Sequence, residues 1–178
     1  MTKTKFLNPE KLLLEAGLKS GVVVADLGCG NGFFTLPAAG ITGESGKVWA
    51  VDILEESLSK IMSLARMDRY KNIRTLRYDL ESGAASSIEN LSCDFAIVGK
   101  VLPQLQHPQN FIREAYRLLK TGATVLLVEW KKQKTQIGPP YEARMSEDEV
   151  KELFTKQGFK LVREMPADSY HYALLLQK

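Results

Sequence analysis

Three aspartates follow predicted β-strands, and the first of them precedes a glycine-rich turn. Asp26 ends the run VVVAD, Asp52 ends KVWAVD, and Asp79 follows IRTLRY. The turn at residues 28–32 reads GCGNG and leads into the apolar pattern of a helix. Because glycine has no Cβ atom, the backbone can turn sharply there and a ligand can approach it, while the helix start offers unpaired N–H groups. A strand, an acid, a glycine turn and a helix in this order are typical of a nucleotide-binding unit.

The spacing of the glycines argues against a dinucleotide cofactor. That fingerprint is G-x-G-x-x-G or G-x-G-x-x-A, and Gly28 and Gly30 fit it, but the third small position falls on Phe33. Asp26, two residues before the turn, would repel a pyrophosphate. It suits a ligand that carries positive charge, such as S-adenosylmethionine with its ammonium and sulfonium groups. Phe33 and Asp26 therefore both count against a nicotinamide-dependent dehydrogenase.

Alternating strands and helices must position these aspartates. Uninterrupted apolar runs predict central parallel strands, and apolar residues at helical spacing predict the helices between them. Pro37 predicts a kink or a late start in the helix after the glycine turn, and Thr121-Gly122 is expected to end the helix that Pro108 opens. The predicted strands are residues 22–25, 47–51, 73–78, 94–98, 123–128, 159–165 and 170–177.

This alternation predicts an α/β fold with a doubly wound, mostly parallel seven-stranded sheet and helices on both faces. The short connection around Pro166 makes the last two strands an antiparallel pair, so the C-terminal strand is antiparallel. We expect a single domain over residues 1–178, with a lead-in helix within 1–20 and a hairpin at 158–178. In such sheets ligands bind beyond the carboxyl ends of the strands, where the three aspartates lie.

The chain resembles the class I S-adenosylmethionine-dependent methyltransferases. Their first motif is an acid-x-G-x-G-x-G turn, which residues 26–32 match as DLGCGNG, and their sheet also has seven strands with an antiparallel last one. The resemblance covers nearly the whole chain. It implies S-adenosylmethionine as the cofactor and S-adenosylhomocysteine as its product.

The resemblance also implies which residues bind the cofactor. The backbone of the glycine turn would face the methionine part, with Asp26 near the ammonium group, and Asp52 would accept hydrogen bonds from the ribose hydroxyls. The side chain of Cys29 is expected to serve packing rather than chemistry. The implied cofactor-binding residues are Asp26, Gly28, Cys29, Gly30, Asn31, Gly32, Asp52, Ile53, Asp79, Leu80, Gly99 and Lys100.

The remaining roles concern the adenine ring and the carbonyl groups that would bind the ammonium group. By resemblance, Ile53 would pack against the adenine, Asp79 would accept from its amino group, and the Leu80 N–H would reach a ring nitrogen. The carbonyls around Gly99 and Lys100 would complete the ammonium site.

The acceptor side carries a weaker signal. VLPQL at 101–105 and VEWKK at 128–132 are similar to the small-molecule branch that includes ubiquinone/menaquinone-biosynthesis methyltransferases. Members of that branch often carry a histidine near Pro103, and here it is absent. His107 is a possible base or a solvent-facing residue at a helix start, so no catalytic residue is assigned. Possible walls of an acceptor pocket are Trp130, Tyr141 and Tyr172.

Two other functions stay open beside methyl transfer to a small molecule. An RNA or protein methyltransferase would use the basic run Lys131, Lys132 and Lys134, which a solvated loop explains equally well. A net charge of +3 argues only weakly for nucleic acid. The Asn/Asp-Pro-Pro-aromatic tetrad of enzymes that methylate exocyclic nitrogens is also absent after residues 94–98. The other possibility is a subunit that binds the cofactor without catalysis.

Composition indicates a globular protein of the cytoplasm. The 178 residues are 44% hydrophobic and 25% charged, and Cys29 and Cys93 suggest neither a disulfide framework nor a metal cluster. No apolar leader or membrane-length stretch is present, so neither secretion nor membrane insertion is expected. Lys5 and Phe6 either fold over a bound cofactor or belong to a frayed terminus, and the pattern favours the second. No metal site and no particular oligomeric state is predicted.

Overall fold

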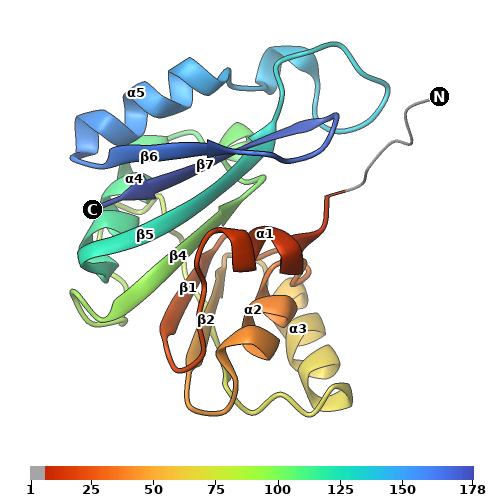
Figure 1. Cartoon of the computed structure of the whole chain (residues 1–178), viewed down its shortest axis with the longest axis vertical. Coiled ribbons are helices and arrows are strands. Elements are labelled where there is room, and N and C mark those ends of the chain that lie inside the picture. The colour runs from red at the N-terminus through yellow and green to blue at the C-terminus, as the bar shows by residue number, and fades with distance from the viewer. Residues whose placement is uncertain (1–6) are drawn as a thin grey trace.

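A computed structural model describes residues 7–178, which form a seven-stranded sheet with helices on both faces (Figure 1). The strand order is β3-β2-β1-β4-β5-β7-β6. Lys5 and Phe6 lie outside the described residues. The strands are β1 (Val23–Leu27), β2 (Lys47–Asp52), β3 (Ile73–Arg77), β4 (Cys93–Gly99), β5 (Leu119–Trp130), β6 (Lys160–Met165) and β7 (His171–Gln177).

The sheet is parallel apart from the pairs made by β7. That strand runs antiparallel to both β5 and β6, and it lies between them. The predicted mostly parallel sheet with an antiparallel C-terminal strand is thus confirmed. The five residues between β6 and β7 are too few for a crossover, so the chain can only turn back on itself.

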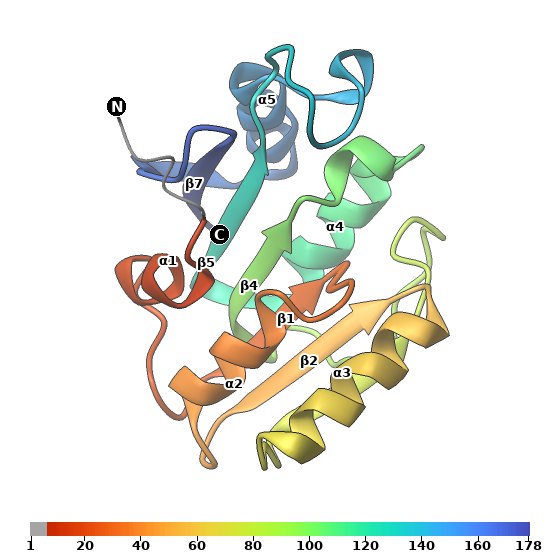
Figure 2. The same ribbon diagram turned by 90° about the vertical axis from the view of Figure 1, so that its right-hand side faces the viewer.

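Helices cover both faces of the sheet, as the alternation of elements predicts (Figure 2). The central strand β1 is buried on both sides: Val24 packs with the helices of one face and Ala25 with those of the other. One face carries α1 (Pro9–Glu15), α2 (Thr35–Thr42) and α3 (Glu55–Met67), and the other carries α4 (Pro108–Leu118) and α5 (Glu147–Gln157).

The strand order reverses between β1 and β4. β1 pairs with β2 on one side and with β4 on the other, and the register sets Leu27 beside both Val51 and Val98. The carboxyl ends of these three strands therefore end level with one another. This is the place where open parallel sheets bind ligands.

The boundary between α4 and β5 differs from the prediction. The expectation that Thr121-Gly122 ends the helix is wrong, because the helix ends at Leu118 and β5 begins at once with Leu119. Gly122 has φ +80°, and its N–H donates to the carbonyl of Lys178 at 2.9 Å. This glycine therefore serves an irregular stretch of the strand, next to the register shift between β4 and β5.

Two helix starts follow their sequence signals. α2 begins at Thr35, so Pro37 falls in the first turn and marks a late start. α5 begins with a capping box, in which Ser146 and Glu149 each accept a hydrogen bond from the other's backbone N–H.

None of the helices in residues 7–178 has both the length and the apolar character required to cross a bilayer.

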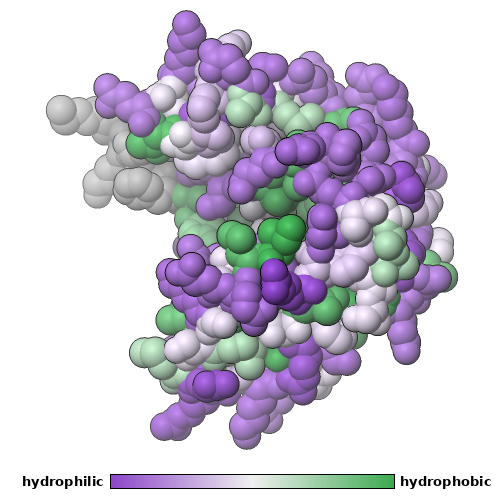
Figure 3. Space-filling view, turned by 180° about the vertical axis from the view of Figure 1, so that it is seen from behind, coloured by the Kyte–Doolittle hydropathy of each residue, from purple (hydrophilic) through white to green (hydrophobic). Residues whose placement is uncertain are grey.

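On the back of the molecule, hydrophobic side chains gather near the centre of the face and hydrophilic side chains surround them (Figure 3).

Candidate functional site

A cavity of about 580 Å³ lies at the carboxyl ends of β1, β2 and β4. Most of the predicted cofactor-binding residues line it, although they come from four separate stretches of the chain. Those that line it are Asp26, Gly28, Cys29, Gly30, Asn31, Asp52, Ile53, Asp79, Leu80, Gly99 and Lys100.

Gly32 is the predicted residue that does not line this cavity. A Cβ atom at Gly32 would lie 2.9 Å from Cγ1 of Ile61, which is closer than packed atoms approach. Gly32 therefore lets the end of the turn pack against α3.

Sequence reasoning missed several other lining residues. Most are neighbours of predicted ones, but Gln104, Leu105 and Phe111 arrive from the segment after β4 and from α4. From the sequence, Phe33 counts only as an argument against a dinucleotide cofactor. The missed residues are Phe33, Phe34, Leu54, Tyr78, Glu81, Val101, Gln104, Leu105 and Phe111.

The glycine turn is fixed by close packing and by backbone hydrogen bonds. Gly28 has φ +70°, and a Cβ atom there would lie 2.5 Å from Cγ2 of Val101. The N–H groups of Gly28 and Cys29 both donate to the Val51 carbonyl, at 2.9 and 3.1 Å. A Cβ atom at Gly30 would meet nothing within 4 Å, so this part of the turn faces open space.

Asp52 ties the glycine turn to the end of β2. One carboxylate oxygen accepts from the Gly30 N–H at 2.8 Å, and the other accepts from the Leu54 N–H at 2.9 Å. The side chain also lines the cavity. Asp52 therefore shapes the turn in addition to the predicted ribose contact, and each oxygen still has acceptor capacity for a ligand hydroxyl.

Asp26 is a buried acid at the floor of the cavity. It is 2% exposed, and Oδ2 accepts from the Thr35 hydroxyl at 2.6 Å. Burial, together with the smaller effect of the Asp52 charge, raises the pKa of Asp26 to about 7, although the Thr35 hydrogen bond opposes the change. A cation in the cavity would favour the ionised form. Burial also raises the pKa of the Cys29 thiol, which suits a packing role.

The loop after β3 brings Tyr78, Asp79, Leu80 and Glu81 to the cavity. The Tyr78 hydroxyl donates to the Ala84 carbonyl at 2.8 Å, and an Asp79 carboxylate oxygen accepts from the Glu81 N–H at 2.9 Å. These contacts curl the loop on itself, so that Asp79 and Leu80 face the cavity.

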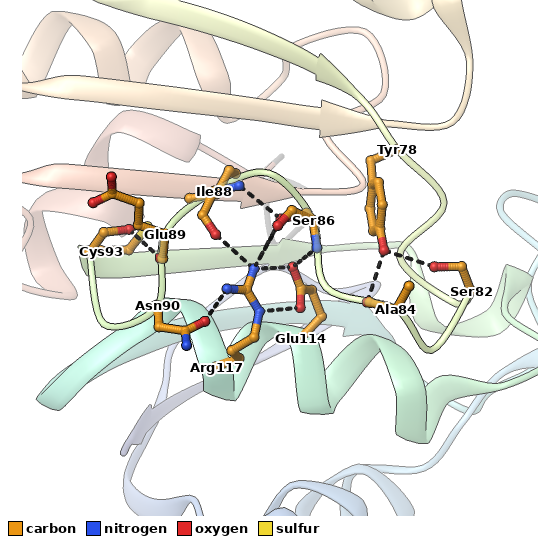
Figure 4. A network of polar contacts seen from close by, with 11 residues as sticks. Tyr78, Ser82, Ala84, Ser86, Ile88, Glu89, Asn90, Cys93, Glu114 and Arg117 are labelled. Atoms are coloured by element: carbon orange, nitrogen blue, oxygen red, sulfur yellow. Dashed lines mark hydrogen bonds and ion pairs between the residues drawn. The ribbon is translucent and has the colours of Figure 1, made fainter.

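A second network fixes the same loop to α4 (Figure 4). Arg117 pairs with Glu114 at 2.6 Å and also donates to the Ile88 carbonyl at 2.9 Å and to Asn90. Glu114, which is 4% exposed, accepts from the Ser86 N–H at 3.1 Å. The loop that carries Asp79 and Leu80 to the cavity is thus held by α4.

Lys100 follows β4 in a left-handed backbone conformation. Its φ is +59°, which costs a residue with a side chain about 1 kcal/mol. The Lys100 N–H donates to the Val128 carbonyl at 2.8 Å, and its own carbonyl accepts from the Gln104 amide at 3.0 Å. The carbonyl predicted to bind an ammonium group therefore already has one partner. The ammonium nitrogen of Lys100 lies 4.1 Å from the centroid of the Phe33 ring.

Glu129 supports the segment after β4, a role that no local sequence pattern indicates. It is 1% exposed and accepts from the N–H groups of Leu102, at 2.9 Å, and Trp130, at 3.1 Å. Burial raises its pKa to about 7, although these backbone hydrogen bonds oppose the change.

The residues considered for the acceptor side are placed outside the cavity lining. The Trp130 ring packs against His171, with centroids 4.2 Å apart, and the Tyr172 hydroxyl donates to the Met145 carbonyl at 3.3 Å. The His107 N–H donates to the Glu81 carboxylate, and Tyr141 is 38% exposed. None of these four candidate residues is among the lining residues of the cavity.

The basic run is partly engaged by its own neighbours. Lys131 donates to the Asp168 carbonyl at 3.1 Å, and Lys132 pairs with Glu149 at 3.2 Å. Within residues 7–178, no cluster of three or more metal-ligating side chains is present.

Residues 18–167 match a family model described as a methyltransferase domain. A demethylmenaquinone methyltransferase of Lactococcus lactis is 29% identical over 119 residues, which cover 67% of this chain and 46% of that protein. A ubiquinone/menaquinone biosynthesis C-methyltransferase of Escherichia fergusonii is 27% identical over 117 residues, with 66% and 46% covered. The chain thus spans about half the length of these curated relatives.

Among solved structures, the chain is similar to an S-adenosylmethionine-dependent methyltransferase from Aquifex aeolicus. The TM-score is 0.89 at 29% identity, and the alignment covers 96% of this chain and 89% of that one. These similarities confirm the predicted resemblance to S-adenosylmethionine-dependent methyltransferases of the ubiquinone/menaquinone type.

Proposed function

Since the chain belongs to the methyltransferase domain family, we propose that it transfers a methyl group from S-adenosylmethionine to a small aromatic acceptor of the hydroquinone class. The observation that carries this proposal is the cavity itself, where Asp52 fixes the glycine turn and Asp26 lies buried beneath it. The acceptor class is taken from the quinone-biosynthesis relatives, whose names specify methylation of menaquinone and ubiquinone precursors.

The residues of the cavity fit this cofactor. Its volume of about 580 Å³ lies within the usual range for small-molecule sites. Acidic side chains predominate among the charged lining residues, which suits a ligand with an ammonium and a sulfonium group. The acids are Asp26, Asp52, Asp79 and Glu81.

When bound, S-adenosylmethionine would supply an activated methyl group: the acceptor would form a bond to the methyl carbon and lose a proton to water, and the electron pair of the broken carbon–sulfur bond would stay on sulfur. The protein then has to align the acceptor and exclude water. Phe33 and Leu105 line the same cavity and offer apolar surface for an aromatic ring. We assign no general base.

A turnover assay tests the proposal. The full chain is incubated without oxygen with labelled S-adenosylmethionine and a short-chain demethylmenaquinone kept reduced by excess dithionite. We expect label in the quinone product and a mass gain of one methylene group. Cofactor binding without methylation of any hydroquinone would contradict the proposal and favour the non-catalytic subunit.

An RNA acceptor predicts a different result. RNA binding would depend steeply on salt through phosphate contacts, and Lys131 and Lys132 would be its first candidates. We do not favour it, because both lysines already bind groups of this chain.

We further propose that residues 1–178 act as a single methyltransferase domain. The cytoplasmic location stays a prediction.

A further inference from the structure

Lys100 is the one basic residue that lines the cavity within the described part of the chain. It stands among four acids, and its ammonium group lies over the ring of Phe33, which is 42% exposed. The cation is therefore placed next to an accessible aromatic face in a cavity whose other charges are negative. That position has no counterpart among the cofactor roles predicted from the sequence, which used only the carbonyl of Lys100.

The ammonium group of Lys100 has no ion-pair partner among residues 7–178. Two nearby carboxylates are engaged elsewhere, since Glu129 accepts from the Leu102 N–H and Asp168 accepts from the His171 ring at 2.8 Å. Partial burial lowers the pKa of Lys100, although the charges of Glu129 and Asp168 raise it. A partly desolvated cation without a carboxylate partner can bind an anion strongly.

The backbone of Lys100 fixes the direction of the side chain. Its N–H is held by Val128, its carbonyl by Gln104, and its φ of +59° is one that glycine would adopt without strain. A lysine kept in a strained conformation at a ligand cavity points to a role for its side chain.

We propose that the ammonium group of Lys100 binds the ionised hydroxyl of the aromatic acceptor, with the acceptor ring beside Phe33. The proposal rests on the proposed function, because it names the group of the acceptor that this cavity recognises. The hydroxyl proton goes to solvent, and the oxyanion that remains increases the electron density on the adjacent ring carbon. A cation at the oxygen stabilises this ionised form, so it lowers the pKa of the bound hydroxyl.

The test uses 4-nitrophenol, whose phenolate absorbs visible light, with the full chain saturated with S-adenosylhomocysteine. Absorbance against pH gives the pKa of the bound phenol. For the wild type, we expect this pKa to be lower than that of free 4-nitrophenol by about 1, which is a tenfold preference for the phenolate. Lys100→Met should abolish the change and weaken phenolate binding about tenfold, while Lys100→Arg should retain most of it.

Lys47→Met is the matched control, because Lys47 also lies over an aromatic ring, that of Trp49, but at the opposite end of β2. It should bind 4-nitrophenolate like the wild type. The other acidic and basic groups near Lys100 are the same in all variants, so the difference between variants reports the ammonium group of Lys100. These groups are Asp26, Asp52, Asp79, Glu81, Glu129, Asp168 and His171.

Three outcomes would overturn the proposal. They are a wild type that does not bind the phenolate, a lowered phenol pKa that survives in Lys100→Met, and a Lys100→Met variant that loses affinity for S-adenosylhomocysteine. In the last case the ammonium group binds the cofactor carboxylate instead. A wild type that binds the phenolate but methylates no hydroquinone would contradict the proposed function and leave the Lys100 site intact.

Discussion

Asp52 links the cofactor-binding role expected from the sequence to the shape of the glycine turn. An acid about twenty residues after the turn predicts a ribose contact, but its hydrogen bonds to the Gly30 and Leu54 N–H groups depend on the folded chain. The same holds for Glu129 and for the ammonium group of Lys100, whose partners lie far away in the sequence. The roles of side chains that belong to a local motif were therefore predictable, and the roles that depend on contacts with distant residues were not.

Replacing Asp52 by alanine should weaken S-adenosylmethionine binding by ten- to a hundredfold. The variant loses charge-assisted hydrogen bonds worth about 1.5–3 kcal/mol and also frees the turn. Calorimetric titration measures the change in Kd. Asp148→Ala is a suitable control, because the Asp148 side chain is 98% exposed on α5. An Asp52→Ala variant with wild-type affinity would remove Asp52 from the site.

The buried acid Asp26 should make cofactor binding depend on pH. Its pKa is raised to about 7 by burial, so the carboxyl is protonated below that pH and its attraction for a cationic ligand is lost. We expect the affinity for S-adenosylmethionine to fall as the pH drops below about 7, by up to about tenfold per pH unit.

The control for this pH dependence is Asp26→Asn, which cannot ionise. The ratio of wild-type to Asp26→Asn affinity, measured between about pH 5 and pH 8, should approach a constant in acid and rise toward neutral pH. Taking the ratio removes the titration of the cofactor itself. A ratio that does not change with pH would show that Asp26 keeps one protonation state.

At the scale of elements, most strands and helices were predictable because their apolar residues are buried on both faces or on one helical stripe. The start of β5 was not, because Thr121-Gly122 has the same local signature as a helix end. The folded chain differs because the Gly122 N–H donates to the carbonyl of Lys178, the last residue of the sequence, and local sequence cannot show this contact.

The glycine turn depends on one close contact with the segment after β4. Gly28→Ala should destabilise the fold by more than the strain of its φ, because the new methyl group would lie 2.5 Å from Val101. Gly17→Ala is the matched control, since Gly17 has φ +88° and open space around it. Urea denaturation should give a loss of about 1 kcal/mol for Gly17→Ala and a clearly larger loss for Gly28→Ala. Equal losses would mean that the contact with Val101 relaxes freely.

The loop between β3 and β4 depends on Arg117 of α4. Arg117→Ala would leave Glu114 buried at 4% exposure without its cation, so we expect a loss of about 3–5 kcal/mol in the free energy of unfolding. Arg113→Ala, on an exposed turn of the same helix, should change stability little. Urea denaturation followed by circular dichroism measures both variants. Similar stabilities for the two would contradict the role of the network in Figure 4.

For the whole molecule, the order of strands and helices predicted the sheet, its two covered faces and the edge that carries the site. The reason is physical: a buried parallel strand needs apolar residues on both sides, and a ligand site forms where consecutive connections diverge. The identity of the acceptor lies outside such rules, because many chemistries use this kind of fold. We propose the acceptor class from the names of the quinone-biosynthesis relatives and from the cation at Lys100.

The most direct test of the central claim is a calorimetric titration of the full chain with S-adenosylmethionine, with NADH titrated in parallel. We predict saturable binding of S-adenosylmethionine at one site and no binding of NADH, because Asp26 and Phe33 oppose a dinucleotide. Binding of NADH alone would contradict the cofactor assignment and the roles given to Asp26 and Asp52.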